Sequence, residues 1–573
     1  MSKYKYATID IETTGLNRFS DQITYVGIGF CKSINSEEPD KYCIYDMMDY
    51  SQRQECRKRL KYIVDNGIKC VWQNGKFDTL FLELHDGVSL PIDDDVMLMG
   101  TSYDLAAEHG LKPMAMRYLG VPNWDISKKD KTSHKLEVVT PYLKFDVKYT
   151  WQLYIYFRTH MNKLQIRNYK KLLKPAYLMY RDVERTGIYL DTKQMNSVKK
   201  EYEYRKEEQL EKLNSKHNIN WNSPQQVAKA LFEVDGLPVL KKSEKTGSPS
   251  ADASTLNKLK FQGYEIAETL LQYKAYDTAL KMFLNRWPED SKYDGRLHPS
   301  FNLTNVVTGR TSCQNPNLQQ VPRDKNVRSL FKAPKGKVFF EADYSQLELR
   351  IAADYSGDPT MIRIYNTGGD IHTETAKTMT GGREPTKEER SKAKAVNFGF
   401  LYGMQAKKFV TYAFDSYNTQ FTLQEATAYR QAFFNKYTRL LPWHKEMAIL
   451  CEMEGGVANR FGRFRALPKI YSRNSYERGE AERRAINTPV QGTGSDILIS
   501  AAAEIHKKLS PEGLSIVGTV HDSIVGEFYE EDADWIVEEI RKIMVHPQLM
   551  DDFGIELKVP LEVDIGIGPW GSK

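Results

Sequence analysis

Between residues 335 and 354, the pattern of hydrophobic and polar positions predicts a strand followed directly by a helix. Val338 to Glu341 is a β-branched and aromatic run, which is typical of a strand. From Ser345 onward, apolar residues recur among charged ones at helical spacing. Asp343 lies at the junction, where a carboxylate can project from a rigid base. A single acid there is more often a helix cap than a catalyst, so its interpretation depends on a partner.

A second acid lies at the tip of a predicted hairpin nearer the C-terminus. Residues 515–520 and 524–528 are apolar runs, and residues 521–523 separate them, with Asp522 in the middle. Asp343 and Asp522 would then both stand at strand ends. Two such carboxylates are what a pair of Mg²⁺ ions requires, and two ions about 4 Å apart are a recurring device of phosphoryl transfer. The pattern therefore favours a two-metal site.

Acids recur in similar positions within the first 165 residues. An alternating run at the N-terminus predicts a strand that carries Asp10 and Glu12 on one face. Asp78 follows a second apolar run, and Tyr142 and Asp146, four apart, would share one face of a helix. Each of these patterns alone occurs by chance in many chains, where such acids are solvated.

Taken together and in order, the segments DIET (10–13), NGKFD (74–78) and YLKFD (142–146) resemble the three motifs of proofreading 3′–5′ exonucleases. The resemblance implies that four carboxylates hold two metal ions and that a tyrosine orients the attacking water. The implied metal ligands are Asp10, Glu12, Asp78 and Asp146, and the tyrosine is Tyr142.

The segments DYSQLELR (343–350) and VHDSI (520–524) resemble the two metal-binding palm motifs of family A DNA polymerases. The resemblance extends over nearly the whole chain. It implies template-directed addition of dNTPs to a primer 3′ end, in DNA replication, with 3′–5′ proofreading. Asp343 and Asp522 would hold two ions, Mg²⁺ or alternatively Mn²⁺, with the backbone carbonyl of Tyr344 as an added ligand.

The same resemblance implies a nucleotide site and a DNA site. Within residues 390–403, two cations and two aromatic residues step by four along one predicted helix, which suits a triphosphate whose base stacks beyond it. Glu348 would exclude a 2′-hydroxyl, and Arg310 would donate into the minor groove at the primer end, where all correct pairs share acceptors. The expected nucleotide-binding residues are Arg390, Lys394, Phe398, Tyr402, His372, Glu348 and Gln346. The expected DNA-binding residues are Arg310, Arg483, Asn487, Gln491 and His521.

The resemblance implies a mixed α/β and α+β fold with two domains. We expect a ribonuclease H-like 3′–5′ exonuclease domain over residues 1–165 and a right-hand polymerase domain over 166–573. The polymerase domain would comprise a thumb at about 192–290, a palm at about 291–354 and 485–573, and fingers at about 355–484. The thumb would hold a charged helix, a basic tip and a second helical stretch from 254 to 287. We also expect no 5′-nuclease domain before Asp10, which is typical of phage enzymes.

Composition limits the protein class. A chain of 573 residues favours several compact units, and a mean hydropathy of −0.56 without a long uncharged apolar run argues against a membrane span. Six cysteines without a CxxC pair indicate reduced thiols in a cytoplasmic protein. The net charge of +6 comes from the part beyond residue 165, which weakly favours a nucleic-acid surface. We expect a monomer that binds primer–template DNA and dNTPs, with a replisome helicase or primase as further partners.

Two short charged runs have simpler interpretations. The acids at 93–95 are expected to form a solvated loop or a helix cap, and the basic run at 128–131 a charged loop. Ser523 departs from the family, which most often has Glu there. Because neighbouring strand residues point to opposite sides, we expect Ser523 to matter far less than Asp522, holding at most a water.

Two other functions share parts of this pattern. A single-subunit RNA polymerase has the same palm chemistry, but Glu348 and the exonuclease acids favour DNA synthesis, and comparing dNTP with rNTP incorporation distinguishes the two. A non-catalytic DNA-binding descendant of a polymerase would not need intact metal ligands, and primer extension distinguishes it from an enzyme.

Overall fold

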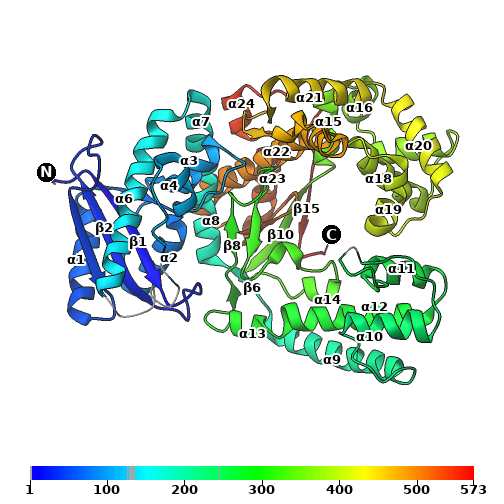
Figure 1. Ribbon diagram of the computed structural model, residues 1–573, viewed down its shortest axis with the longest axis horizontal. Helices are drawn as coiled ribbons and strands as arrows, with labels where there is room; N and C mark the ends of the chain where they lie inside the picture. The colour runs from blue at the N-terminus through cyan, green and yellow to red at the C-terminus, as the bar shows by residue number, and fades with distance from the viewer. Residues whose placement is uncertain (1–2, 126, 128–135, 244, 573) are drawn as a thin grey trace.

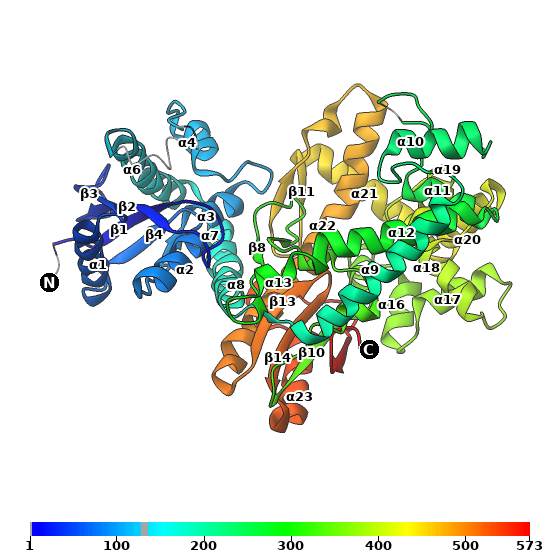
Figure 2. The ribbon, with the colours of Figure 1, turned by 90° about the horizontal axis from the view of Figure 1, so that it is seen from below.

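The computed structural model describes residues 3–125, 127, 136–243 and 245–572. A smaller N-terminal part lies beside a larger part, in which a central sheet is flanked by two helical lobes (Figures 1 and 2). In the described residues, no helix has the length and apolar character needed to cross a membrane. The basic run at 128–131 lies outside the described residues.

The N-terminal part is a five-stranded sheet in the order β3-β2-β1-β4-β5. β1 pairs antiparallel with β2 and parallel with β4, so the sheet is mixed. β2 is buried along its whole length because helices cover the sheet. The strands are β1 (Tyr6–Thr13), β2 (Ile23–Cys31), β3 (Lys41–Asp46), β4 (Lys69–Trp72) and β5 (Asp94–Asp95). The helices are α1 (Tyr50–Asp65), α2 (Gly75–Asp86), α3 (Val96–Tyr103), α4 (Leu111–Leu119), α6 (Leu136–His160) and α7 (Lys163–Asn168).

Of the two interpretations of the acids at 93–95, a solvated loop or a helix cap, the structure shows the helix cap at Asp95, and Asp93 and Asp94 are partly buried. Asp95 is fully buried and caps α3, because its side chain accepts hydrogen bonds from the backbone N–H groups of Met97 and Gly75. Asp94 accepts hydrogen bonds from the hydroxyls of Tyr154 and Tyr169. Burial raises the pKa of Asp95 to about 6. These acids tie α3 to the sheet and to the connector that follows α7.

A buried ion pair joins the two parts. Lys76 of α2 contacts Glu184 of α8 (Lys174–Thr186), with the two side chains 4% and 6% exposed. The same lysine donates to the carbonyl of Phe301 (2.7 Å), and Glu184 accepts from the Phe301 N–H (2.7 Å). Breaking such a pair leaves a buried charge without a partner, so it holds the two parts in one orientation. The predicted boundary at residue 165 falls inside α7 and stays a prediction.

The central sheet of the larger part has the order β13-β14-β10-β15, and all its pairs are antiparallel. It comprises β10 (Lys337–Tyr344), β13 (Ser515–Val520), β14 (Ser523–Tyr529) and β15 (Val563–Ile567). Three small strand pairs complete the β structure: β6 (Ile188–Tyr189) with β7 (Arg296–Leu297), β8 (Ser300–Asn302) with β9 (Ser312–Gln314), and β11 (Gly456–Ala458) with β12 (Phe464–Ala466).

One helical lobe follows residue 191. The helical stretch expected over 254–287 is present but divided, because the chain turns after α11 at Gly263 (φ 90°), a conformation that glycine adopts readily. The elements are α9 (Thr192–Asn214), α10 (Pro224–Ala228), η2 (Lys229–Val234), α11 (Ala253–Phe261), α12 (Glu265–Ala279), η3 (Leu280–Leu284) and α13 (Trp287–Asp290). A separate apolar cluster around Trp221, Leu231 and Leu270 forms the core of this lobe.

The other lobe and the helices around the sheet come from residues 347–553. The helices are α15 (Leu347–Ser356), α16 (Pro359–Asn366), α17 (Ile371–Met379), α18 (Lys387–Leu401), α19 (Ala406–Tyr417), α20 (Leu423–Lys436), α21 (Leu440–Glu454), α22 (Ser475–Leu509), α23 (Ala533–Val545) and α24 (Gln548–Phe553). α22 contains 35 residues and is buried along most of its second half. It contacts α8, α15, α21 and α23, so it ties the sheet to the lobe.

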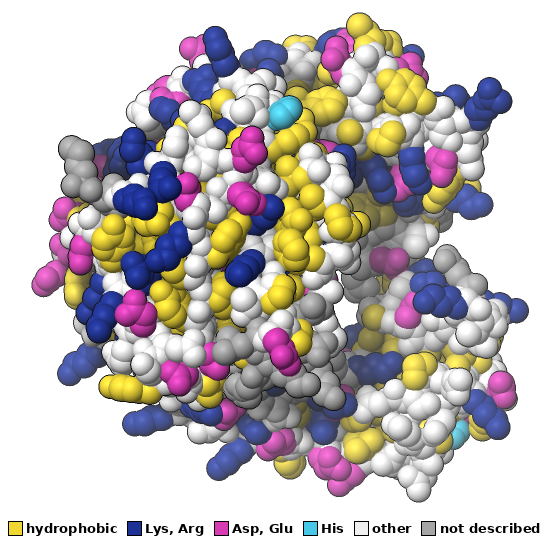
Figure 3. Space-filling model, turned by 60° about the vertical axis from the view of Figure 1, so that its left-hand side comes forward, with side chains coloured by type: hydrophobic (Ala, Val, Ile, Leu, Met, Phe, Trp, Pro, Cys, Tyr) yellow, Lys and Arg dark blue, Asp and Glu magenta, His cyan; other side chains and the backbone are white. Residues whose placement is uncertain are grey.

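A deep hollow separates the two lobes, and Lys and Arg side chains lie along its walls (Figure 3). At the outer side the lobes touch. The Ser254 hydroxyl of α11 donates to Asp415 of α19, and the Lys258 ammonium lies 5.5 Å from the ring centroid of Phe414. The hollow is therefore bridged by contacts between α11 and α19.

Candidate active sites

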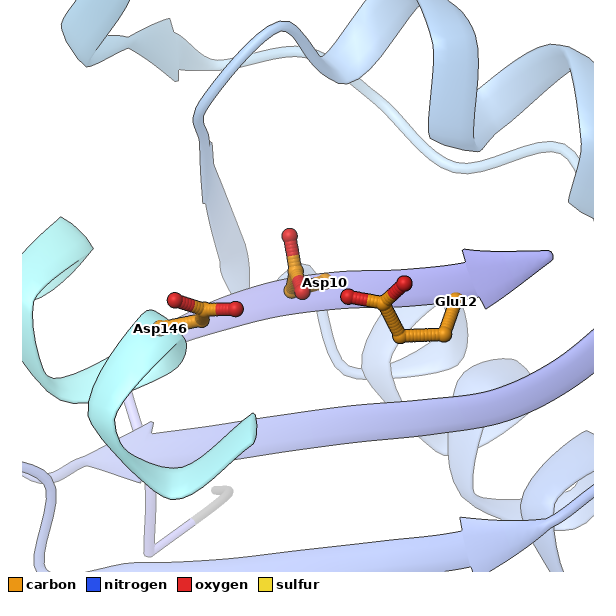
Figure 4. Close-up of side chains that lie close together, drawn as sticks. All are labelled: Asp10, Glu12 and Asp146. Carbon is orange, nitrogen blue, oxygen red and sulfur yellow. The ribbon is translucent and has the colours of Figure 1, made fainter. Parts of the chain in front are cut away.

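Three acidic side chains meet on the N-terminal sheet. Asp10 and Glu12 project from one face of β1, and Asp146 reaches them from α6 (Figure 4). Each offers a carboxylate oxygen within 4.8 Å of the others. The close approach of α6 depends on Gly27 of β2, since a Cβ there would lie 3.3 Å from the Cβ of Leu143. The lack of a side chain at Gly27 thus allows α6, which carries Asp146, to pack closely on the sheet that carries Asp10 and Glu12.

Asp78, the fourth predicted acid, is fixed beside this cluster in the first turn of α2. Its Oδ1 accepts from the backbone N–H of Ile11 (3.1 Å), on the strand that carries Asp10. Burial, then repulsion from Asp146 and Asp78, raises the pKa of Asp10 well above its ordinary value. Burial also raises the pKa of Asp78. A divalent cation would relieve this repulsion, and a set of carboxylate oxygens alone fits a hard metal ion.

Two side chains that the sequence analysis missed complete this site. Lys112 of α4 donates from Nζ to the Tyr142 hydroxyl (2.7 Å) and to Oδ1 of Asp146 (2.7 Å). The Trp124 indole N–H donates to the same oxygen (2.8 Å). In the sequence, Lys112 is one of many basic residues and Trp124 follows a helix, so no pattern marks them. Only the packing of α4 and its following loop against α6 brings them to the acids.

Asp343 and Asp522 lie on adjoining strands of the central sheet. Asp343, the penultimate residue of β10, pairs in register with Ser523 at the start of β14. Asp522 lies in the turn before β14, directly after His521, whose φ is 55°. The Tyr344 N–H donates to the Asp522 carbonyl (3.2 Å), which ties the turn to β10. Two carboxylates thus stand at the same end of two paired strands, a donor set that fits divalent cations.

Ser523 turns away from this pair. Its side chain is buried, and Oγ donates to the carbonyl of Val520 (2.8 Å). The hydroxyl closes the turn between β13 and β14, and its role in holding a water stays a prediction. This hydrogen bond gives Ser523 a structural role in the turn, at a position where the family most often has Glu.

Replacing Asp522 by Asn is expected to stabilise the metal-free protein at pH 8. Burial raises the pKa of Asp522 from its ordinary 3.8 to about 6, with repulsion from Glu348 and Asp343 adding to burial and Arg310 opposing it. Because the folded pKa exceeds the unfolded one, the cost of the ionised carboxylate is complete above pH 6 and fades as the pH falls toward 4. The displacement corresponds to about 3 kcal/mol at most.

Unfolding temperatures in EDTA check this prediction. The Asn variant should unfold at a higher temperature than the wild type at pH 8, and the gain should shrink at pH 4.5. A variant that is less stable at pH 8, or whose gain grows on acidification, would show that the carboxylate is not destabilising.

Glu348 joins two other predicted contact residues, Arg310 and Tyr402. Arg310, from the loop before β9, donates to one of its carboxylate oxygens, and the Tyr402 hydroxyl donates to the other. Tyr402 lies one residue past the end of α18, where the predicted four-residue steps would have kept it inside the helix. The three side chains come from separate segments and form one hydrogen-bonded unit next to Asp522.

A buried network that the sequence analysis missed supports the loop of Arg310. Asp496 of α22 is fully buried and accepts from Arg463 (2.6 Å) and from Asn459. The Arg463 guanidinium packs on Gly309, whose φ of 84° and lack of a side chain allow the contact. Ser495 donates to the Gly309 carbonyl (2.8 Å). This network fixes the backbone of the residue that precedes Arg310.

The accessible side of α18 carries the predicted nucleotide residues. Arg390 and Phe398 are partly exposed and Lys394 is exposed, whereas the intervening residues 395–397 are buried. The Arg390 guanidinium is paired with Asp370, which caps α17. A negatively charged ligand at this face would therefore have to share Arg390 with Asp370.

His372 is almost completely buried, which the sequence analysis did not foresee. Its Nδ1 lies 2.8 Å from Nδ2 of Asn397, whose Oδ1 accepts from Thr375. The amide therefore donates to Nδ1 and leaves the ring proton on Nε2, for which the described residues provide no partner. Burial lowers the pKa of His372 to about 4, so the ring is neutral at pH 7. It can donate a hydrogen bond but supplies no charge.

The predicted DNA residues of α22 lie on its accessible face. Arg483, Asn487 and Gln491 line a cavity of about 890 Å³ together with Phe398 and Tyr402. The structure thus brings Phe398, near the end of α18, and the predicted DNA residues of α22 to one cavity, which Arg390 and Lys394 do not line. Gln346 lies apart from it at the start of α15, where its side chain accepts from the Tyr365 hydroxyl (3.2 Å).

Comparisons with known proteins agree with this geometry. Residues 191–572 match the family model described as DNA polymerase family A, and residues 1–162 match that of a 3′–5′ exonuclease. DNA polymerase I of Aquifex aeolicus is 30% identical, over 99% of this chain and 96% of its own length. Thermostable DNA polymerase I of Thermus aquaticus is 31% identical over 86% of this chain. The chain matches only 56% of the length of that relative, so it spans about half of it.

A solved structure shows the same fold. The polymerase domain of Pol1 from M. smegmatis, in complex with DNA primer–template and dNTP, superposes with a TM-score of 0.83 at 23% identity. The match covers 99% of this chain and 96% of that chain. The expected mixed fold of an exonuclease unit followed by a polymerase unit is confirmed. The relatives named here are bacterial, and the phage origin stays a prediction.

Proposed function

The chain belongs to DNA polymerase family A, and from this premise we propose that it synthesises DNA on a primed template and removes mismatched 3′ ends with its N-terminal part. The observation that carries the proposal is the presence of two separate carboxylate sites in one chain. One is built from β1 and α6, and the other from β10 and the β13–β14 turn. Both are suited to divalent cations, which we propose are Mg²⁺, with Mn²⁺ as an alternative.

At the polymerase site, Asp343 and Asp522 would hold the metal ions, with the backbone carbonyl of Tyr344 as an added ligand. Bound there, the ions would lower the pKa of the primer 3′-hydroxyl and stabilise the charge on the leaving pyrophosphate. The primer 3′-hydroxyl would lose its proton to the solvent as a bond forms between the 3′-oxygen and the α-phosphorus of the dNTP. The bond from that phosphorus to the oxygen bridging to the β-phosphate would break, and pyrophosphate would leave. Partial burial of Asp522 lowers the local dielectric and strengthens its interaction with cations.

Side chains of α18 and α17 would bind the incoming nucleotide. Arg390 and Lys394 suit its phosphates by charge, and Phe398 offers a ring on which the base can stack. His372 would add a neutral N–H donor from Nε2, which the geometry of Asn397 leaves available. We propose that Gln346, directly before α15 and three residues after Asp343, also contacts the incoming nucleotide.

The unit of Glu348, Arg310 and Tyr402 would select the correct substrate. Glu348 lies where the family excludes a 2′-hydroxyl, and its two hydrogen bonds hold it in place. Arg310 would leave Glu348 to donate into the minor groove at the primer end. The side chains of Arg483, Asn487, Gln491 and His521 are proposed to contact the primer–template.

Primer extension on a primed single-stranded template tests the proposal. Extension with dNTPs but not with rNTPs supports it, and a preference for rNTPs would indicate an RNA polymerase instead. A protein that binds DNA without extending it would be the non-catalytic alternative. Incubation without dNTPs should shorten the primer from its 3′ end. A helicase or primase partner, the monomeric state and the residue limits of thumb, palm and fingers stay predictions.

Phe398→Tyr is expected to increase incorporation of dideoxynucleotides relative to dNTPs. A tyrosine hydroxyl here can occupy the space left by the missing 3′-hydroxyl of the nucleotide, whereas phenylalanine cannot. The ratio of kcat/KM for a dideoxynucleotide and its dNTP, measured on one primer–template, checks this for both enzymes. Equal use of the two substrates by the unmodified protein would contradict it.

A further inference from the structure

Lys112 occupies the middle of the N-terminal acidic site although the family motifs assign it no role. It is the second residue of α4, and its side chain is 20% exposed. Its ammonium is 2.7 Å from the Tyr142 oxygen, 2.7 Å from Oδ1 of Asp146 and 4.5 Å from the centroid of the Tyr142 ring. One cation therefore contacts both residues that α6 contributes to the site.

The direction of the contact to Tyr142 follows from the chemistry of the groups. An ammonium can only donate hydrogen bonds, so the Tyr142 oxygen must accept from Lys112. This uses one lone pair of that oxygen and turns the hydroxyl proton away from the lysine. The Tyr142 hydroxyl is also hydrogen-bonded to Asp146, so Lys112 and Asp146 together fix its position and direction.

Oδ1 of Asp146 is also fixed by a second donor. The Trp124 indole N–H lies 2.8 Å from it, so that oxygen accepts from two N–H groups. Lys112 lies 5.4 Å from the centroid of the Trp124 ring, which limits the positions that the ammonium can take. The second oxygen of Asp146 remains for a metal ion.

The positive charge of the Lys112 ammonium would offset negative charge that the substrate brings to the site. The carboxylates of Asp10, Glu12, Asp78 and Asp146 would be balanced by two divalent cations. The phosphodiester of a DNA strand adds a further negative charge, which grows at its oxygens in the transition state. The ammonium of Lys112 supplies a positive charge of matching size beside that position.

We propose that Lys112 is a positioning residue for 3′–5′ hydrolysis, acting through Tyr142. This rests on the proposed exonuclease function. In that reaction a bond forms between the water oxygen and phosphorus, and the bond from phosphorus to the 3′-oxygen of the preceding nucleotide breaks. The water loses a proton to the solvent, the leaving oxygen gains one, and a nucleoside 5′-monophosphate is released. Lys112 fixes the position of the Tyr142 oxygen, and from that position beside Asp146 the tyrosine would orient the attacking water.

The principal experiment compares Lys112→Met with Lys144→Met in digestion of single-stranded DNA. Lys144 is an exposed lysine of the same part of the chain, on α6 between Tyr142 and Asp146, so it controls for general loss of charge. Lys112→Met should lower kcat about 100-fold, the usual effect of losing one aligned donor, with KM changed less than threefold. Primer extension by the same variant should equal that of the wild type, which shows that the chain is folded. Unchanged digestion by Lys112→Met would overturn the proposal.

A double-mutant cycle with Tyr142→Phe tests the route through the tyrosine. If Lys112 acts through the hydroxyl, the double variant should be no slower than the slower single variant. Multiplied losses would show that Lys112 acts on the substrate directly and would overturn the positioning role.

The affinity of the site for a metal ion distinguishes a positioning role of Lys112 from a purely structural one. In a background of Asp343→Asn and Asp522→Asn, which disables the other site, Mn²⁺ binding is followed by electron paramagnetic resonance. Loss of the competing ammonium should tighten Mn²⁺ binding roughly tenfold, by Coulomb's law in a partly buried site. Weaker binding would mean that the lysine only supports the structure. If the wild-type protein does not digest DNA at all, the proposed exonuclease function fails, independently of Lys112.

Discussion

Asp522→Ala is expected to lower the rate of primer extension by several orders of magnitude, whereas Ser523→Ala should lower it less than tenfold. Asp522 lies in the turn before β14, beside the strand that carries Asp343, and replacement by Ala removes one of the two proposed metal-binding carboxylates. Ser523 is buried, and its hydroxyl donates a hydrogen bond to the carbonyl of Val520. Tenfold in rate corresponds to about 1.4 kcal/mol of barrier, which is the range of one lost hydrogen bond.

Single-turnover extension at saturating dNTP measures both effects on the chemical step. Fluorescence anisotropy with labelled primer–template should give equal DNA affinity for the three proteins, so that the rates report chemistry. A Ser523→Ala enzyme as inactive as Asp522→Ala, with normal DNA binding, would show that the serine takes part in the reaction.

The second large effect is expected for Asp10→Ala combined with Glu12→Ala. This change should abolish 3′–5′ digestion and leave primer extension within about twofold of the wild type. Both carboxylates belong to the cluster on β1, and their removal leaves Asp146 and Asp78 without the other half of a two-metal site. The polymerase acids lie on a different sheet, so their geometry should not change.

Digestion of a labelled single strand and extension of a matched primer are measured on the same preparation. The double variant should extend mismatched primers directly, whereas the wild type should shorten them first. If extension also disappears in a protein with an unchanged unfolding temperature, the two sites are not independent, and the buried contact of Lys76 with Glu184 would be the first route to examine.

Residues with strong local patterns could be predicted without the structure. The strand that carries Asp343, the helix that follows it and the hairpin around Asp522 all follow from periodicity in short windows. The same holds for the faces of α18 and α22, because residues four apart lie together on any helix. The metal-binding character of the acids followed from the resemblance, which rests on these local segments.

The helical lobe shows where local patterns fail. Residues 254–287 have enough apolar positions for one helix, but the turn at Gly263 divides them. The acids at 93–95 have the composition of a loop, yet their partners are Tyr154, Tyr169 and the backbone of α2 and α3. These partners lie up to 75 residues away in the chain. A hydrogen bond over that distance leaves no periodic signal.

The sequence by itself determined which elements carry the acids, since the direction of a side chain on a strand or a helix is a local property. Only the tertiary structure shows which side chains hydrogen-bond to the buried polar groups of the sites. Asp146 accepts from Lys112 and Trp124, Asp496 accepts from Arg463 and Asn459, and His372 accepts from Asn397. These contacts depend on how helices pack, because burial forces each polar group to find a partner from whichever segment lies nearest. The protonation, orientation and charge of the sites therefore belong to the packed fold.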